Sequence, residues 1–165
     1  MRIVLGSDHA GFALKEQVKA ALLAAGHEVT DVGTASGESV DYPGFAASAA
    51  RLVSRGAADR GVLACGSGNG VAIAANKIAG IRAINARDAH EAEMARRHND
   101  ANVITLSGQR LSADEAGAIV AAFLGTGFEG GRHARRVAQI AELEGSPADE
   151  PAREVVSSDD VRSAP

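Results

Sequence analysis

The sequence predicts an α/β protein with a doubly wound architecture, in which helices cover both faces of a five-stranded parallel sheet as an α/β/α sandwich. Three observations predict it. Five short apolar runs alternate with stretches whose apolar residues recur every three or four positions. Glycine-rich turns follow the first and third runs. With four Phe, one Tyr and no Trp, the core must be built from Val, Ile, Leu and Ala, which suits helices packed closely on a parallel sheet.

The expected strands are the apolar runs themselves. Each is short and bounded by glycine or polar residues, as is typical of a strand buried on both faces. In chain order they are expected over residues 2–5, 28–32, 61–65, 82–85 and 102–106.

The expected helices lie between the strands and after the last one. Asp88 with Glu91, and Ser112 with Glu115, have the spacing of capping boxes that open a helix. A polar loop over residues 36–43 precedes the second helix. In order, the helices are a stretch with Leu14, Val18 and Leu22 that ends at Gly26, residues 44–54, residues 71–77, a stretch from Asp88 toward His98, a stretch from Ser112 to Leu124, and a last one with Val137, Ile140 and Leu143 that ends at Gly145.

Residues 1–145 are expected to form one domain and residues 146–165 a disordered acidic tail. The last 20 residues hold three of the four prolines, no aromatic residue, and five acidic against two basic side chains. Such a composition cannot bury enough apolar surface to form a core.

Charge and cysteine content narrow the class of protein. The 17 basic and 21 acidic side chains give a net charge of −4, which argues against a nucleic-acid partner. No apolar run is long enough for a membrane span or a signal-peptide core. One cysteine, Cys65, excludes an intrachain disulfide framework and a zinc ribbon. These features fit a cytoplasmic protein.

The glycines do not form a nucleotide-binding motif. A G-x-G-x-x-G fingerprint starting at Gly66 or Gly68 would need its last glycine where Val71 or Ile73 stands, and the Gly6–Gly11 spacing lacks the Lys of a P-loop. The five histidines form no HExxH motif and no pair four residues apart. No metal and no cofactor is expected, although dispersed metal ligands remain an alternative.

A thiol beside a glycine loop is the strongest candidate site. Cys65 ends the third expected strand, and the loop that follows opens a helix. Backbone N–H groups at a helix start bind anions, and a thiol there is more easily deprotonated, so Cys65 can serve as a base or nucleophile. The alternatives are that Cys65 is a small buried apolar residue and that Ser67 is only a helix N-cap. The loop residues are Gly66, Ser67, Gly68, Asn69 and Gly70.

Asp8 and His9 follow the first strand at its carboxyl end, where parallel sheets bind their ligands. Either residue can instead cap the following helix. His98 and Asn99 close a later helix, where His98 can also simply complement the helix C-terminus.

Arg132 and Arg136 share one helix face and can hold a phosphate from two directions. A solvated basic turn has the same pattern. Taken together, the candidate residues supply what an aldose–ketose isomerase of a sugar phosphate needs: a base for the proton alpha to the carbonyl, donors for an enediolate, an acid–base group for ring opening and a phosphate clamp.

Five segments, in this order along the chain, resemble the type B ribose-5-phosphate isomerase family, which includes the galactose-6-phosphate isomerase subunits. They are GSDHAGF, DYPGFA, CGSGNGVAIAANKIAGIRA, RRHNDANV and EGGRHARRV. The resemblance spans roughly residues 1–145. It implies a Rossmann-like fold and a homodimer, or a tetramer, whose composite active sites lie at the subunit interface and bind a small sugar phosphate.

The resemblance also implies residue roles. Cys65 is then the general base that moves a proton between C1 and C2, Ser67 assists it, and the amides of Gly66 to Gly70 form the oxyanion hole. His98 opens the furanose ring, and Asp8 and Asn99 hold sugar hydroxyls. The implied phosphate ligands are His9 and, from the partner subunit, Arg132 and Arg136.

The chain departs from the family pattern at two places. Another branch of the family carries a glutamate base directly after the glycine loop, where this chain has Val71. Valine cannot take a proton, so Cys65 is the base that remains. The stretch from Asn99 to Arg110 is one residue longer than in the family, which offsets Arg110, a further phosphate or sugar contact.

The expected activity is the interconversion of ribose 5-phosphate and ribulose 5-phosphate through a cis-enediolate. One alternative is isomerisation of a four- or six-carbon sugar phosphate, such as a tetrulose phosphate or galactose 6-phosphate. Another is a non-catalytic phosphosugar-binding protein. A thiol redox protein is disfavoured because no second cysteine is present to resolve a mixed disulfide.

Overall fold

The computed structural model describes residues 1–145 of the 165-residue chain. The predicted acidic tail, residues 146–165, lies outside the described residues. Within residues 1–145, five strands and six helices alternate up to the last strand, which two helices follow.

The strands form one parallel sheet with the order β2-β1-β3-β5-β4. This arrangement confirms the predicted five-stranded parallel sheet. The chain moves outward from β1 to β2 and then crosses to the other side of β1 for β3, so the switch point lies between β1 and β3. Ligands of such sheets bind at the carboxyl ends of the strands beside this point. The strands are β1 (Arg2–Ser7), β2 (Glu28–Asp31), β3 (Arg60–Cys65), β4 (Ala83–Asn85) and β5 (Val103–Ser107).

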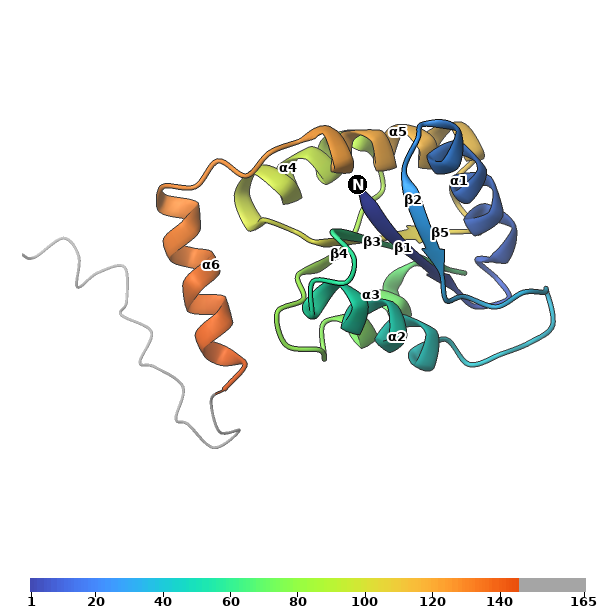
Figure 1. Ribbon diagram of the computed structural model, residues 1–165, viewed down its shortest axis with the longest axis horizontal. Coiled ribbons are helices and arrows are strands. Elements are labelled where there is room, and N and C mark those ends of the chain that lie inside the picture. Colours follow the sequence, from blue (N-terminus) through green and yellow to red (C-terminus); the bar gives the residue numbers. More distant parts are fainter. Residues whose placement is uncertain (146–165) are drawn as a thin grey trace, which may run out of the picture.

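Helices cover both faces of the sheet, as predicted. One face carries α1 (Phe12–Ala24), α4 (Ala89–Asn99) and α5 (Ala113–Gly125), and the opposite face carries α2 (Tyr42–Ser54) and α3 (Asn69–Ala75) (Figure 1). The cores on both faces consist of Val, Ile, Leu and Ala, with Phe123 as the one fully buried aromatic side chain among the described residues. Three alanines of α2, Ala46, Ala49 and Ala50, are fully buried and let this helix lie close to the strands.

Two local predictions need correction. The second helix begins at Tyr42 and not at Gly44, because Pro43 occupies its first turn, where the missing N–H of proline needs no partner. Ser112 and Glu115 form the predicted reciprocal capping box. Asp88 does accept the N–H of Glu91, but the Glu91 carboxylate turns to Arg87, so the second half of that box does not form.

The last helix, α6 (Arg132–Leu143), lies beside the sandwich, on the side away from the arrowhead of β1 in Figure 1. Its N-terminal turn contacts α4 through His133, and the Glu144 carboxylate beyond its C-terminus accepts the backbone N–H of Gly80. Ile140 and Leu143 remain 43% and 69% exposed. One side of α6 is therefore an apolar surface that residues 1–145 leave largely exposed.

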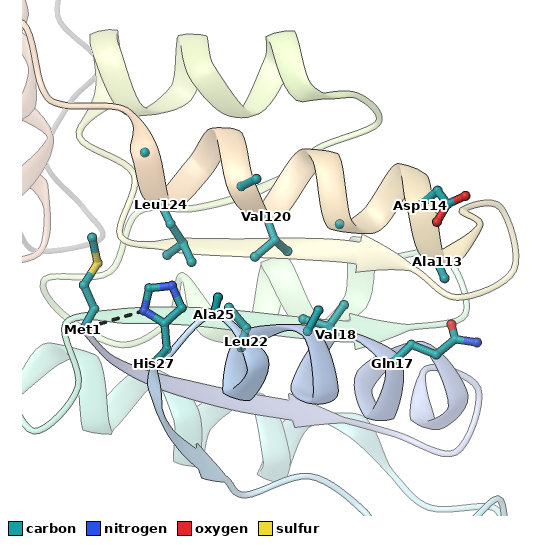
Figure 2. A pocket seen from close by; sticks show the side chains of 14 residues that line it. Met1, Gln17, Val18, Leu22, Ala25, His27, Ala113, Asp114, Val120 and Leu124 are labelled. Atoms are coloured by element: carbon teal, nitrogen blue, oxygen red, sulfur yellow. Dashed lines mark hydrogen bonds between the residues drawn. The ribbon is translucent and has the colours of Figure 1, made fainter.

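A groove of about 760 Å³ separates α1 from α5 on the outside of the sandwich. Figure 2 shows Val18 and Leu22 of α1 facing Val120 and Leu124 of α5, with the amino group of Met1 against His27 at one end. None of the predicted site residues lines this groove. Among residues 1–145, no helix has the length and apolar character that crossing a membrane requires.

Candidate active site

The predicted thiol and its glycine loop lie at the carboxyl edge of the sheet, beside the switch point. Cys65 is 4% exposed, and its Sγ accepts a hydrogen bond from the backbone N–H of Gly68 at 3.1 Å. This contact ties the sulfur to the glycine loop. Gly68 has a φ of +81°, and a Cβ there would lie 2.4 Å from Oδ1 of Asn85. The turn that brings this N–H to the sulfur therefore requires glycine.

The loop is anchored to the neighbouring strand β5. The hydroxyl of Thr105 donates to the carbonyl of Gly68 at 2.8 Å, and the hydroxyl of Ser107 donates to that of Gly66 at 2.7 Å. Within residues 1–145, the backbone N–H groups of Gly66, Ser67 and Gly70 have no hydrogen-bond partner. The carbonyls are thus fixed while several N–H groups remain available for an anion.

The hydroxyl of Ser67 accepts the N–H of Asn69 at 3.2 Å. Ser67 therefore accepts a backbone N–H at the start of α3, as the N-cap interpretation predicted, but the residue at the N-cap position itself is Gly68. Because the hydroxyl is the acceptor in this bond, its own hydrogen remains free to be donated.

Asp8 and His9 lie next to this loop because β1 and β3 end side by side, with Ser7 opposite Ala64. Gly11 lies against the end of β3, since a Cβ on it would come within 2.7 Å of the backbone nitrogen of Cys65. Asp8 is buried, and its Oδ1 accepts the N–H of Gly11 at 2.9 Å. Nδ1 of His9 lies 3.1 Å from the backbone nitrogen of Val40 and 3.3 Å from its carbonyl oxygen, so Nε2 is the ring nitrogen left for a ligand.

Two buried side-chain oxygens at the same edge have no hydrogen-bond partner within the described part of the chain: Ser7 Oγ at the end of β1 and Asn85 Oδ1 at the end of β4. Unpaired buried polar atoms are uncommon in folded proteins. Their place beside the thiol loop fits a site that takes a ligand rich in hydroxyl groups. Arg110 also lies at this edge, beyond β5, with an exposed side chain.

His98 and Asn99 lie at the opposite edge of the sheet. They end α4, which runs back from the carboxyl ends to the amino ends of the strands. The guanidinium of Arg82, directly before β4, donates to the carbonyl of Asn99 at 3.0 Å. The carbonyl of Asn102, directly before β5, accepts the N–H of Gly61 near the start of β3. Asn99 is therefore a neighbour of the points where strands begin.

Arg132 and Arg136 lie at this amino edge as well, because α6 begins against the end of α4. The imidazole of His133 stacks on that of His98 with ring centroids 4.2 Å apart. Both arginines are exposed. Five residue steps of about 3.3 Å each, from Arg60 to Cys65, separate the edges, so the two edges lie roughly 16 Å apart along β3.

His98, Glu129 and His133 are the one group among the described residues that could hold a metal ion, with one ligand atom from each inside a span of 4.8 Å. Arginines surround it: Arg97 pairs with Glu129, and Nε of Arg132 approaches Nε2 of His133 at 3.4 Å. These positive charges oppose a cation and favour an anion near the cluster.

Sequence reasoning missed several residues that shape the two edges. Tyr42 packs against the thiol loop, since a Cβ on Gly70 would lie 2.7 Å from its ring, and Gln109 packs in the same way against Gly66. Asn85 donates to the carbonyl of Ser67 at 3.1 Å. The motifs DYPGFA and EGGRH contained Tyr42, Glu129 and His133, so the segments were found but not these members of them.

Comparison with known proteins gives consistent matches over the described residues. A family model for Ribose/Galactose Isomerase matches residues 3–140. The chain is 45% identical over 143 residues to ribose-5-phosphate isomerase B of Escherichia coli, which covers 87% of this chain and 96% of that protein.

Solved structures agree with this match. A ribose-5-phosphate isomerase B from Clostridium thermocellum is similar with a TM-score of 0.86 at 46% identity, covering 87% of this chain and 97% of that one. The enzyme of the same name from Mycoplasma genitalium, solved with bound ribulose-5-phosphate, has a TM-score of 0.85 at 38% identity, with 88% and 97% covered.

Proposed function

This chain belongs to the ribose/galactose isomerase family and is an aldose–ketose isomerase, and from that premise we propose that it interconverts ribose 5-phosphate and ribulose 5-phosphate. The observation that carries the proposal is the thiol of Cys65. It is buried at the switch point, accepts an N–H from Gly68, and adjoins a loop with unpaired N–H groups within residues 1–145.

In the proposed reaction, the Cys65 thiolate removes the proton from C2 of the open-chain aldose. The negative charge moves to O1, where the N–H groups of Gly66, Ser67 and Gly70 can hold it. The proton on O2 passes to O1, with the free hydrogen of the Ser67 hydroxyl placed to relay it. The Cys65 thiol then returns its proton to C1, which gives the ketose. Each well-placed oxyanion donor contributes about 3–4 kcal/mol to such a transition state.

The remaining predicted residues bind and open the substrate. His98 catalyses ring opening, Asp8 and Asn99 hold sugar hydroxyls, and Nε2 of His9 donates to the phosphate. Arg132 and Arg136 hold the phosphate from two directions. Arg110, which is exposed beyond β5, is a further contact of the substrate from the carboxyl edge in this proposal.

A single chain cannot bring all of these residues to one substrate, because the two edges are about 16 Å apart along β3. We therefore infer a dimer in which the carboxyl edge of one chain meets the amino edge of its partner. His98 and Asn99 then come from the partner together with Arg132 and Arg136. The apolar side of α6 supports a role of this helix in the contact, because Ile140 and Leu143 are exposed within residues 1–145.

Initial rates over four-, five- and six-carbon aldose and ketose phosphates test the proposed function. The five-carbon pair should give the highest kcat/KM. A preference for a four- or six-carbon pair would retain the isomerase and change its substrate. No turnover of any member, with sugar-phosphate binding intact, would favour a phosphosugar-binding protein.

A further inference from the structure

The carboxylate of Glu129 lies beside the stacked imidazoles of His98 and His133 at the amino edge of the sheet, almost equally far from the two Nε2 atoms. The rings of His98 and His133 are parallel within 2°, and Oε2 of Glu129 is 3.7 Å from Nε2 of His98 and 3.8 Å from Nε2 of His133. A small rotation of either side chain would bring one of these pairs into hydrogen-bond distance.

Arg97 fixes the position of Glu129. Its guanidinium pairs with Oε1 of Glu129, and its carbonyl accepts the backbone N–H of Glu129 at 3.1 Å. With Oε1 occupied, Oε2 is the oxygen that faces the imidazoles. The guanidinium also lowers the pKa of the Glu129 carboxyl, so this group is an anion at neutral pH.

His133 does not compete for this oxygen as a donor. Nε of Arg132 donates toward Nε2 of His133 at 3.4 Å, which makes that nitrogen an acceptor. Burial lowers the pKa of His133, and the charges of His98 and Arg132 act in the same direction. His133 is therefore neutral at pH 7, and Nε2 of His98 is the imidazole nitrogen left to donate to Glu129.

We propose that Glu129 is a positioning residue that holds His98 with its proton on Nε2 and leaves Nδ1 free to open the sugar ring. The proposal rests on the proposed function of His98. Nδ1 takes the proton of the anomeric hydroxyl O1, the C1–O4 bond breaks as C1=O1 forms, and O4 receives the proton back from Nδ1. Between these transfers the imidazolium is stabilised by the Glu129 carboxylate, as in other carboxylate–histidine pairs.

Ring opening can be measured apart from isomerisation. In a Cys65→Ser background the enzyme cannot move the C2 proton, but an active His98 still exchanges the two anomers of ribose 5-phosphate. This exchange is followed by NMR with substrate carrying carbon-13 at C1. Adding Glu129→Gln, which keeps the shape and removes the charge, should slow the enzyme-catalysed exchange about tenfold.

The matched control is Glu93→Gln in the same background. Glu93 also pairs with Arg97, at 3.1 Å, and lies on α4 with it, but among residues 1–145 the carboxylate that approaches His98 is that of Glu129. This variant should change the exchange rate less than twofold. An equal loss in both variants, or no loss with Glu129→Gln, overturns the positioning role while leaving His98 as the ring-opening residue. No exchange above the spontaneous rate in the Cys65→Ser background would instead refute the proposed role of His98.

The proton position is a second readout that a merely structural role would not fix. In nitrogen-15 NMR of the unaltered protein, with signals assigned through His98→Asn, neutral His98 should carry its proton on Nε2. A proton on Nδ1 would contradict the proposal, whatever the exchange rates are.

Discussion

At the scale of single residues, Cys65 combines two properties that its sequence position left as alternatives. It packs with Val4, Leu63 and Val71 as a buried apolar residue would, and its sulfur also accepts the N–H of Gly68. Val71, at the position where another branch of the family has a glutamate base, is fully buried. Proton transfer in the proposed reaction therefore depends on one atom, Sγ of Cys65.

Replacing Cys65 by Ser should abolish isomerisation and leave folding and phosphate affinity nearly unchanged. Serine keeps the size of the side chain and leaves the loop unchanged. A serine hydroxyl is a far weaker acid than a thiol, so it does not form the anion that would remove the substrate proton. Initial rates, thermal unfolding and calorimetric binding of inorganic phosphate check this. A variant that retains more than about a tenth of the wild-type rate would place the base elsewhere, because positioned base catalysis contributes about 10²–10⁴-fold.

Residues carried by one continuous segment could be predicted from the sequence, whereas residues that act across segments could not. The loop after Cys65 was recognisable because its glycines and its strand adjoin in the chain. Asn85 and Gln109 touch that loop from other strand ends, and Glu129 reaches His98 from 31 positions away. The local sequence around these residues does not indicate which residues they contact in the fold.

At the scale of elements, the thiol loop depends on a backbone turn that only glycine makes easily. Gly68→Ala should cost about 2 kcal/mol or more of unfolding free energy, because alanine is strained at a φ of +81° and its Cβ would collide with Asn85. The isomerase activity should also fall, because the backbone N–H of residue 68 would move away from Sγ of Cys65. Urea unfolding and initial rates measure both effects.

The matched control for this variant is Gly117→Ala. Gly117 lies inside α5 with open space around its Cβ position. Alanine there should stabilise the protein by about 0.5–1 kcal/mol through helix propensity. If Gly68→Ala were equally harmless, the loop would be able to rebuild its turn without glycine.

The junction of α1 and β2 contains an ionic cluster that should make stability depend on pH. Lys15, which is 3% exposed, and Lys19 both donate to Asp31. Desolvation acts to raise the pKa of the Asp31 carboxyl, but the hydrogen bonds from both lysines and from the N–H of Gly33 outweigh it and lower the pKa. A lowered pKa in the folded state adds stability above about pH 4, and this stability is lost as the pH falls through the folded-state value.

Asp31→Asn should therefore reduce the unfolding free energy by about 1–2 kcal/mol at pH 7 and have little effect once the carboxyl is protonated in both states. Urea unfolding at pH 7 and at low pH measures the difference. Glu38→Gln, at an exposed loop position, removes one charge that has no buried partner within residues 1–145, and it should change neither value. A loss for Asp31→Asn that is independent of pH would show that packing, and not charge, holds this junction.

The strands and helices were predictable because apolar periodicity reports directly which faces are buried. The predictions were wrong where a residue is compatible with two local structures or two hydrogen-bond partners. Pro43 ended the predicted loop but belongs to the first turn of α2, and Glu91 fitted a capping box but binds Arg87 with its carboxylate. A local pattern cannot rank such competing partners, because the ranking depends on neighbours that folding brings together.

At the scale of the whole molecule, the direction of the helices distributes the candidate site residues over two opposite edges of the sheet. A helix that follows a parallel strand runs back to the edge where strands begin, so α4 carries His98 and Asn99 away from Cys65. The alternation of strands and helices in the sequence already contained this direction. The motif roles alone did not reveal it, because they assign each residue to the substrate and not to an edge of the sheet.

Mixing inactive variants tests the composite site and identifies which residues each chain supplies. Cys65→Ser and His98→Asn chains, refolded together, should recover about a quarter of wild-type activity, because half of the dimers are mixed and each has one intact site. Cys65→Ser with Arg136→Ala should behave in the same way. His98→Asn with Arg136→Ala is the control: both residues come from the same edge of one chain, so every site keeps a lesion and activity should stay near zero. If the first mixture also stays inactive while the Cys65–Arg136 mixture recovers, His98 serves the same chain as Cys65, and α4 must approach the thiol loop in a way that this fold does not show.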